Sequence, residues 1–414
     1  MHPIYHRDGD YISKEEDAVF GGDMRKRGML STDGRFSYCG ILVCNKVLHV
    51  FLPKTHVLSQ GRSILQDARL LMDCLCKYCN QTATHEKAGE ESNAGGELSH
   101  LSLAKWILQD YMRHGLYTVS AHVTTKSDSG KINWTATVRN TIPVMNQRHQ
   151  CVYPALHTTS INYSIKTLIT QIHQYVVGDL DSTFGWWLSG SMSGVAPMCR
   201  NVNILIDKQQ AIRAINNELS VVYSDREIVL LKKLRQYLEL NPESSDEDVF
   251  LSGISDFEYV WEKMCSVVFN DQSNSIAGEI PVPAYVYDGA TKVSAQNKQR
   301  MDVIINDKDC IAILDAKYYD MNTTKPGWGD LVKQFYYEKS LSAVTNKKIK
   351  NYFVVPASNP AGMPEHAVVV DRRLMRLDDD FSPITILPLN VNSVMQSYIN
   401  DADSERYRGL VFNG

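Results

Sequence analysis

Two short apolar runs separated by a polar turn constrain the fold of this chain more than any other sequence feature. The first run is Asp302-Val-Ile-Ile305, the turn is Asn306–Asp309, and the second run is Ile311-Ala-Ile-Leu314, which leads into Asp315-Ala-Lys317. Apolar runs of this length predict strands, and the polar turn between them predicts a hairpin. Side chains alternate along a strand, so Asp315 and Lys317 point to one side, and the hairpin brings Asp302 back toward them.

Two carboxylates and an ammonium group at one sheet edge are the set that metal-dependent phosphodiester hydrolysis requires. Mg²⁺ prefers oxygen and typically takes one or two carboxylates plus water and substrate oxygens; Mn²⁺ is expected to substitute for it. Asp302 and Asp315 are the candidate metal ligands, and the Ala316 backbone carbonyl is a third. Lys317 is expected to orient the attacking water and to stabilise developing negative charge. Taken alone, such a triplet also fits a surface ion pair, but it is the only [Asp/Glu]-x-Lys triplet in the chain.

Two flanking helices supply further candidates. Residues 255–269 form an apolar stripe at helical spacing, and Glu258 and Glu262 lie four residues apart on one face. Either glutamate is a candidate metal-site residue, and a solvated acidic edge is the alternative for both. Downstream, Asp330–Lys339 predicts a second helix, whose Gln334 and Tyr337 are candidates to face the substrate backbone.

These segments together resemble a known family. They are Phe257-Glu258…Trp261-Glu262, Arg300-Met-Asp302, Ile313-Leu-Asp-Ala-Lys-Tyr318 and Lys333-Gln-Phe-Tyr-Tyr-Glu338, with Phe51-Leu-Pro-Lys54 and Gly130-Lys-Ile-Asn-Trp-Thr-Ala-Thr137 upstream. In order and spacing they resemble the McrC-like subunits of LlaJI-type restriction systems. One departure is Met301-Asp302, where the family usually has Pro-Asp, and it bears on the assignment of the first carboxylate.

The resemblance implies an endonuclease of the PD-(D/E)xK superfamily that cuts double-stranded DNA in antiviral defence. It also implies a partner, an McrB-like AAA+ GTPase that carries DNA recognition. The chain has no Gly-x-x-x-x-Gly-Lys-Ser/Thr sequence, so it is not expected to hydrolyse nucleotides itself. The alternative function is a catalytically inactive scaffold or DNA clamp with the same fold, which would need none of the carboxylates.

We expect two regions with an α/β fold overall. Residues 1–245 are expected to be an α+β partner-docking region, and residues 249–414 a nuclease domain with a mixed central sheet flanked by helices. The acidic segment 241–248 is the expected linker. Within the first region the patterns predict an irregular arm over residues 1–30 and a hairpin over residues 36–52. They predict paired strands over residues 116–123 and 132–138. They also predict helices over residues 61–80, 101–115, 164–178, 207–219 and 226–240.

Composition excludes several function classes. The net charge of −4 argues against an avid DNA binder held by phosphate contacts alone. No apolar run approaches the roughly 20 residues of a membrane span, and the N-terminus has no secretory h-region. Nine cysteines, several within apolar runs, fit reduced thiols in a cytoplasmic protein. Cys74-Leu-Cys-Lys-Tyr-Cys79 with His85 matches a zinc knuckle poorly, because Cys74 and Cys76 fall on different helix faces.

Overall fold

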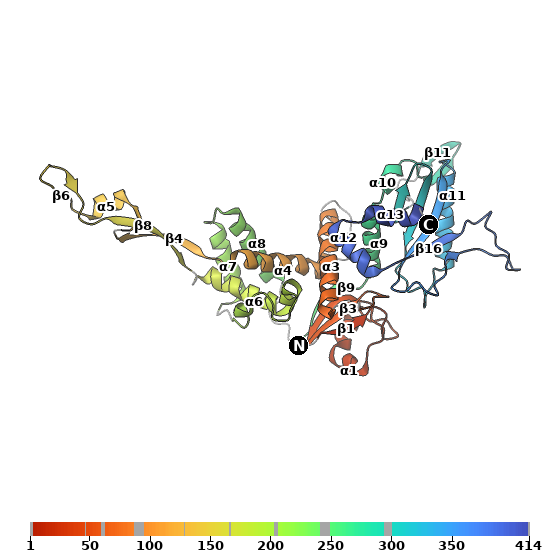
Figure 1. Cartoon of the computed structure of the whole chain (residues 1–414), viewed down its shortest axis with the longest axis horizontal. Helices are drawn as coiled ribbons and strands as arrows, with labels where there is room; N and C mark the ends of the chain where they lie inside the picture. The colour runs from red at the N-terminus through yellow and green to blue at the C-terminus, as the bar shows by residue number, and fades with distance from the viewer. Residues whose placement is uncertain are drawn as a thin grey trace. The chain divides into compact units, whose positions relative to one another are not determined.

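The structure is a computed structural model that describes residues 3–45, 47–58, 63–86, 95–127, 129–164, 167–202, 206–240, 249–293 and 300–412. The chain divides into two compact units (Figure 1). Unit 1 contains Met1–Ser102 and Asp246–Gly414, and unit 2 contains Leu103–Ser245. Residues 1–245 are therefore not one region, because their first part belongs with the C-terminal part of the chain. The expected linker 241–248 lies outside the described residues.

The N-terminal sheet of unit 1 is built from both ends of the chain. Its strand order is β1 (Ile4–Arg7), β3 (Val47–Leu52), β2 (Cys39–Cys44) and β9 (Val249–Ile254). The expected hairpin is confirmed as β2–β3, while β1 pairs with β3 in parallel and β9 pairs with β2 in antiparallel fashion. The strands β2 and β9 approach closely at two glycines, since a Cβ on Gly40 would lie 2.5 Å from the Gly253 Cα.

Residues 3–30 contain regular secondary structure, so the expected irregular arm is wrong. After β1 the chain forms α1 (Lys14–Glu16), a π-helical turn (Asp17–Gly21) and α2 (Gly22–Lys26). Phe20 and Met24, four residues apart, share a helix face and are buried with Phe36 and Phe51 of the adjoining hairpin region. This small set of large side chains fixes the segment onto the sheet despite its polar composition.

The second sheet of unit 1 is mixed, as expected. Its order is β12 (Val303–Asn306), β13 (Cys310–Ala316), β14 (Lys348–Pro356), β16 (Ile384–Leu389) and β15 (His366–Ala367). The three central strands are parallel, and the two edge strands are antiparallel to their neighbours. Burial on both faces explains why β13 reads as a continuous apolar run. A separate hairpin, β10 (Ala284–Tyr287) and β11 (Ala290–Val293), stands outside this sheet.

Helices cover both faces of this sheet (Figure 1). On one face α11 (Trp328–Ser342) buries Tyr337 and Leu341 against Ile304, Ile311 and Ile313. On the other lies α9 (Phe257–Val268), whose Trp261 indole donates a hydrogen bond to the Val354 carbonyl at 3.2 Å. The remaining helices of this part are α10 (Ser273–Ile276), α12 (Val391–Asn400) and α13 (Ser404–Phe412).

The helix α3 (Ile64–Glu86) joins the two sheets within unit 1. It packs on β2 and β3 and also on α9 and α12. The Cys74 thiol donates to the Met264 sulfur of α9 at 3.4 Å, and the Lys77 ammonium donates to the Tyr398 carbonyl of α12 at 2.6 Å. Cys74 and Cys76 are both buried helix residues, as expected from the sequence.

Unit 2 combines a helical part with a long β-ribbon. The helices are α4 (Gly95–His114, which begins in unit 1), α6 (Leu168–Ser189), a 3-10 turn (Pro197–Cys199), α7 (Lys208–Leu219) and α8 (Asp225–Leu240). The ribbon pairs β4 (Val119–Lys126) with β8 (His157–Ser164), and β5 (Lys131–Ile132) lies on the other side of β8. It continues into α5 (Trp134–Asn140) and the short hairpin β6 (Val144–Met145) and β7 (Cys151–Val152).

The strand expected over residues 132–138 is wrong. Only Lys131 and Ile132 are extended, and α5 follows because the Asn133 side chain accepts a hydrogen bond from the Ala136 amide at 3.0 Å and caps the helix. The partner of β4 is therefore β8, whose residues lie much farther along the chain.

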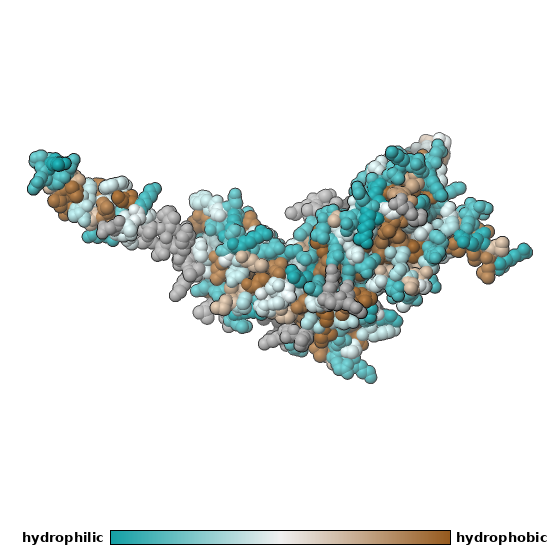
Figure 2. Space-filling view, viewed as in Figure 1, coloured by the Kyte–Doolittle hydropathy of each residue, from teal (hydrophilic) through white to brown (hydrophobic). Residues whose placement is uncertain are grey.

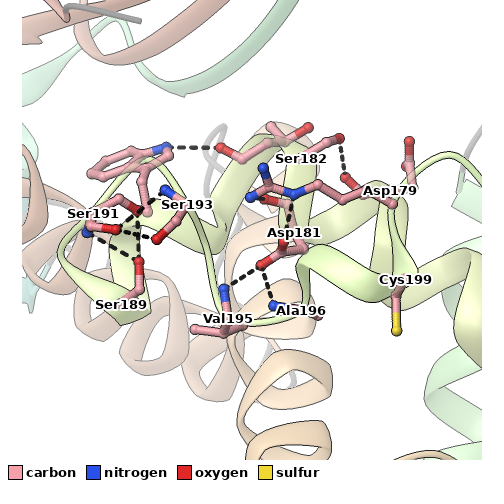
Figure 3. Close-up of polar contacts among 12 residues, drawn as sticks. Asp179, Asp181, Ser182, Ser189, Ser191, Ser193, Val195, Ala196 and Cys199 are labelled. Carbon is pink, nitrogen blue, oxygen red and sulfur yellow. Dashed lines mark hydrogen bonds and ion pairs between the residues drawn. The ribbon is translucent and has the colours of Figure 1, made fainter.

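A buried carboxylate organises the loop after α6 (Figure 3). Asp181, only 1% exposed, accepts hydrogen bonds from the amides of Val195 and Ala196 at 2.7 and 3.0 Å. Its second oxygen accepts from the Arg200 guanidinium at 2.6 Å. A buried charge needs such partners, so this network has a structural role.

Candidate active site

The hairpin β12–β13 brings the two predicted aspartates together. The register pairs Val303 with Leu314, which sets Asp302 opposite Asp315 just beyond the ladder. The Asp302 carboxylate accepts a hydrogen bond from the Ala316 amide at 2.9 Å and so takes the place of a strand partner. Asp315 is 4% exposed, at the end of the most buried strand of the sheet.

Lys317 lies between two carboxylates. Its ammonium is 2.9 Å from an Asp315 oxygen and 3.0 Å from an Asp330 oxygen. Burial lowers the pKa of Lys317, but the charges of these two aspartates outweigh burial and raise it above its ordinary value. In this metal-free arrangement Lys317 is therefore held as a cation at neutral pH, which suits charge stabilisation.

Asp330 is the member of this group that sequence reasoning missed. It lies in the first turn of α11, where its carboxylate accepts from the Gly327 amide at 2.9 Å and closes the helix N-terminus. Burial raises its pKa, yet the hydrogen bond from Lys317 prevails and leaves the pKa below its ordinary value. The spacing Gly327-x-x-Asp330 is a capping pattern, and it marks the helix start without revealing the contact with Lys317.

The carboxylates raise one another's pKa. Burial first, and then the charge of Asp302, raise the pKa of Asp315 to about 6. Burial and the charge of Glu262 raise the pKa of Asp302. Burial and the charge of Asp315 raise that of Glu262. Three acids thus face a shared space with Lys317 as the cation in contact, and ionising all of them is unfavourable unless further positive charge enters.

The two glutamates of α9 are separated by the structure. Glu262 is half-buried, and the charges of Glu262 and the aspartates act on one another: Asp315 raises the pKa of Glu262, and Glu262 raises that of Asp302. Glu258, one turn earlier, is exposed, and its charge acts on Asp8 of the N-terminal segment. Of the two candidates that the sequence left open, Glu262 is the one that the fold brings to the site.

Gln334 and Tyr337 are both buried instead of facing outward. The Gln334 amide donates to the Tyr352 carbonyl of β14 at 3.0 Å, and the Tyr337 hydroxyl donates to the Arg300 carbonyl at 2.9 Å. Both side chains thus hold α11 and the start of β12 in position. Helical spacing placed them on the correct helix, but it could not show that this face packs on the sheet.

The chain matches a known protein family. The model of the LlaJI restriction endonuclease family matches residues 38–391. The chain belongs to that family. This confirms the family predicted from the sequence, and the match covers all of unit 2 and every strand of the two sheets of unit 1 except β1.

A curated protein and two solved structures are similar to this LlaJI-family chain. The "Type II restriction enzyme BsuMI component YdjA" of Bacillus subtilis (strain 168) is 25% identical over 96% of this chain and 89% of its own length. A chain of the refined half-complex of Thermococcus gammatolerans McrB AAA+ hexamers with bound McrC aligns over 98% of this chain and 99% of that chain, with 14% identity and a TM-score of 0.42. A chain of the cryo-EM structure of the Thermococcus gammatolerans McrBC complex aligns over 64% and 86%, with 12% identity and a TM-score of 0.29.

The donor set of this LlaJI-family site fits a hard divalent cation. Asp302, Asp315 and Glu262 offer carboxylate oxygens, the ligands that Mg²⁺ takes. The amide and carbonyl of one strand residue point to the same edge, so the Ala316 carbonyl is directed toward the side on which Asp302 receives the amide hydrogen bond. The three carboxylates repel one another when ionised, and a bound cation would offset this repulsion.

A hollow of about 770 Å³ opens beside the site in unit 1. Tyr318 and Tyr319, the residues after Lys317, contribute to one wall. Arg7, Arg35 and Lys54 contribute cationic side chains, together with acidic residues that include Asp8 and Asp33. The Tyr318 hydroxyl accepts from the Lys54 amide at 2.7 Å, so the N-terminal sheet and the strand carrying the site share this wall.

The helices and the cysteines are two further features of the chain. None of the helices in the described part of the chain has the length and apolarity to cross a membrane. All nine cysteines are thiols, and most are buried.

Proposed function

We propose that this chain is a Mg²⁺-dependent endodeoxyribonuclease of the PD-(D/E)xK type, acting on double-stranded DNA within a restriction system. The observation that carries the proposal is the convergence of Asp302, Asp315 and Lys317 at the end of one hairpin, with Glu262 facing them. Several buried carboxylates with raised pKa values beside one cation lower the stability of the folded state more than the same residues would at the surface. Such unfavourable clusters are typical of functional sites.

The proposed roles follow from the geometry. Asp302, Asp315, the Ala316 carbonyl and Glu262 would hold the metal. Bound Mg²⁺ supplies positive charge that offsets the charge of the scissile phosphate and lowers the pKa of the attacking water. Lys317, kept cationic by Asp315 and Asp330, would stabilise the negative charge that develops on the phosphate. The cationic side chains of the neighbouring hollow would contact the DNA backbone.

The partner in this proposal is an McrB-like AAA+ GTPase, and unit 2 is the part that would dock on it. The ribbon segment of unit 2 exposes a series of apolar side chains (Figure 2): Trp134, Val138, Ile142, Val144, Met145 and Val152. Such an exposed apolar series is typical of a protein interaction surface. We also propose that the complex acts in the cytoplasm, where its DNA substrate and a reducing environment for the thiols are found.

The test is a plasmid cleavage assay with the full chain, the purified GTPase partner and GTP. We expect cleavage with Mg²⁺ or Mn²⁺, none with excess chelator, and loss of at least about 100-fold in rate for Asp302→Asn. Asp309→Asn is the matched control, because Asp309 is an exposed residue in the turn of the same hairpin.

Two outcomes would reject the assignment. Full cleavage by Asp302→Asn, or cleavage that persists without any divalent cation, would place the chemistry elsewhere. If the wild-type complex leaves DNA intact while the chain still changes the GTPase rate of the partner, the chain is an inactive scaffold with a nuclease fold.

A further inference from the structure

A second group of potential metal ligands lies in the N-terminal segment of unit 1, away from the aspartates. It consists of His6 in β1, Glu16 at the end of α1 and His49 in β3. Because β1 and β3 are parallel and Ile4 pairs with His49, His49 shares a face of the sheet with Ile4 and, two residues on, with His6. Within the part of the chain that the structure describes, no other three His, Cys, Asp or Glu side chains converge as closely.

Two of the three separations in this group are close to those in a tetrahedral metal site. The His6 Nε2 atom lies 3.1 Å from the His49 Nδ1 atom and 3.4 Å from a Glu16 carboxylate oxygen, and the three atoms lie within 4.8 Å of one another. Zinc bonds of about 2.0–2.2 Å in a tetrahedron place neighbouring ligand atoms about 3.4 Å apart. The His6 and His49 rings form a hydrogen bond between Nε2 and Nδ1, and the same Nε2 atom also faces the Glu16 carboxylate, so one proton cannot serve both contacts.

The surroundings hold each ligand in place. The His6 ring stacks on Phe51 with ring centroids 4.8 Å apart, and Phe20 packs its edge on His49 at 4.9 Å. The other Glu16 oxygen accepts from the Ser13 amide at 3.0 Å, so the helix cap fixes the carboxylate. Such supporting contacts are what orient ligands in metal sites. Burial lowers the pKa of His6 below its ordinary value and lowers that of His49 to about 4.

We propose that His6, Glu16 and His49 bind a divalent transition-metal ion of the zinc class. Two imidazoles and one carboxylate select zinc-like ions over Mg²⁺, which prefers the all-oxygen set at Asp302 and Asp315. Three protein ligands leave a fourth position for water. The ion would tie α1 to the sheet by linking it to β1 and β3, and its role is independent of DNA cleavage.

The test measures metal binding by the full-length protein. Chelator-treated wild type is titrated with Zn²⁺ against a chromogenic competitor, and Co²⁺ is used as a spectroscopic probe that would show no thiolate charge-transfer band. We expect one tight site per chain and a rise in melting temperature with Zn²⁺. Glu16→Gln, which keeps an oxygen for the Ser13 amide, should weaken binding at least about tenfold. The matched control is Glu15→Gln, because Glu15 is the exposed neighbouring residue.

His6→Gln is the second variant, and circular dichroism confirms that each variant is folded. Equal Zn²⁺ affinity in wild type and both variants would overturn the proposal. So would a Co²⁺ spectrum dominated by thiolate ligation, because it would move the ion to the cysteines.

Discussion

Replacing Asp315 with asparagine should stabilise the metal-free protein while abolishing its response to Mg²⁺. The Asp315 carboxyl is buried, and burial together with Asp302 raises its pKa from 3.8 to about 6. At about 1.4 kcal/mol per pH unit, this difference corresponds to about 3 kcal/mol of unfavourable ionisation in the folded state at neutral pH. This figure already includes the ion pair of Asp315 with Lys317, which keeps Asp330 as a partner in the Asp315→Asn variant, so we expect a net gain of about 2–3 kcal/mol.

The difference in stability between the wild type and Asp315→Asn depends on pH, and the direction of this dependence follows from the raised pKa of Asp315. Below about pH 4 the Asp315 carboxyl is protonated in both the folded and the unfolded chain, and its ionisation costs nothing. Between about pH 4 and 6 the unfolded chain ionises first, so the wild type loses stability relative to Asp315→Asn as pH rises. Above about pH 6 the difference is constant.

The assay is thermal unfolding of both proteins from pH 4 to 7.5, with chelator and then with Mg²⁺. A gain of 1 kcal/mol corresponds to about 2–4 °C for a domain of about 150–250 residues. With Mg²⁺ the wild type should gain stability by mass action, and the variant should not. Asp309→Asn serves again as the exposed control. A variant less stable than wild type at neutral pH without metal, or an equal response of both to Mg²⁺, would refute the reasoning.

Three other predictions test the remaining features. The Lys317→Arg variant should lose at least about 100-fold in cleavage rate while keeping DNA binding, because a planar guanidinium cannot fit between Asp315 and Asp330 as a compact ammonium does. An unchanged cleavage rate would mean that Lys317 is only a counter-ion. Asp330→Asn keeps an oxygen for the helix cap but removes one charge from Lys317, and single-turnover cleavage should slow about tenfold, whereas a loss of helix content by circular dichroism would point to a structural effect. A fragment starting at Val249 should be unfolded or aggregated, because in it β9 lacks its partner β2, and α9 and α12 lack their contacts with α3. Size-exclusion chromatography tests this, and a folded monomer would contradict the division into units.

The sequence predicted the hairpin β12–β13 because its determinants are local. Asp302 and Asp315 are separated by one turn, and alternation along a strand places Lys317 beside Asp315 without reference to the rest of the fold. The helices on either side followed from apolar spacing, and so did the presence of a glutamate pair on α9. Choosing Glu262 over Glu258 required the docking angle of that helix on the sheet, which spacing does not contain.

What the sequence did not predict depends on distant contacts. The pairing of β9 with β2 joins residues on either side of unit 2, and neither strand carries a local mark of its partner. The first thirty residues contain few apolar side chains, and only the fold shows that Phe20 and Met24 meet Phe36. Asn133 overrode a strand-like pattern by capping α5, which is a case of side-chain chemistry prevailing over β-propensity.

The closure of the N-terminal sheet by β9 has a consequence during protein synthesis. Strand β2 is made early, yet its partner on one side emerges only after the whole of unit 2. At about 5–20 residues per second, this delay is on the order of ten seconds. Throughout it the nascent chain presents an unpaired, apolar strand edge, which is the kind of surface that chaperones bind and that aggregates when left exposed. Unit 2, being continuous, can complete its fold on the ribosome first, so the nuclease part of the chain is the last to become ordered.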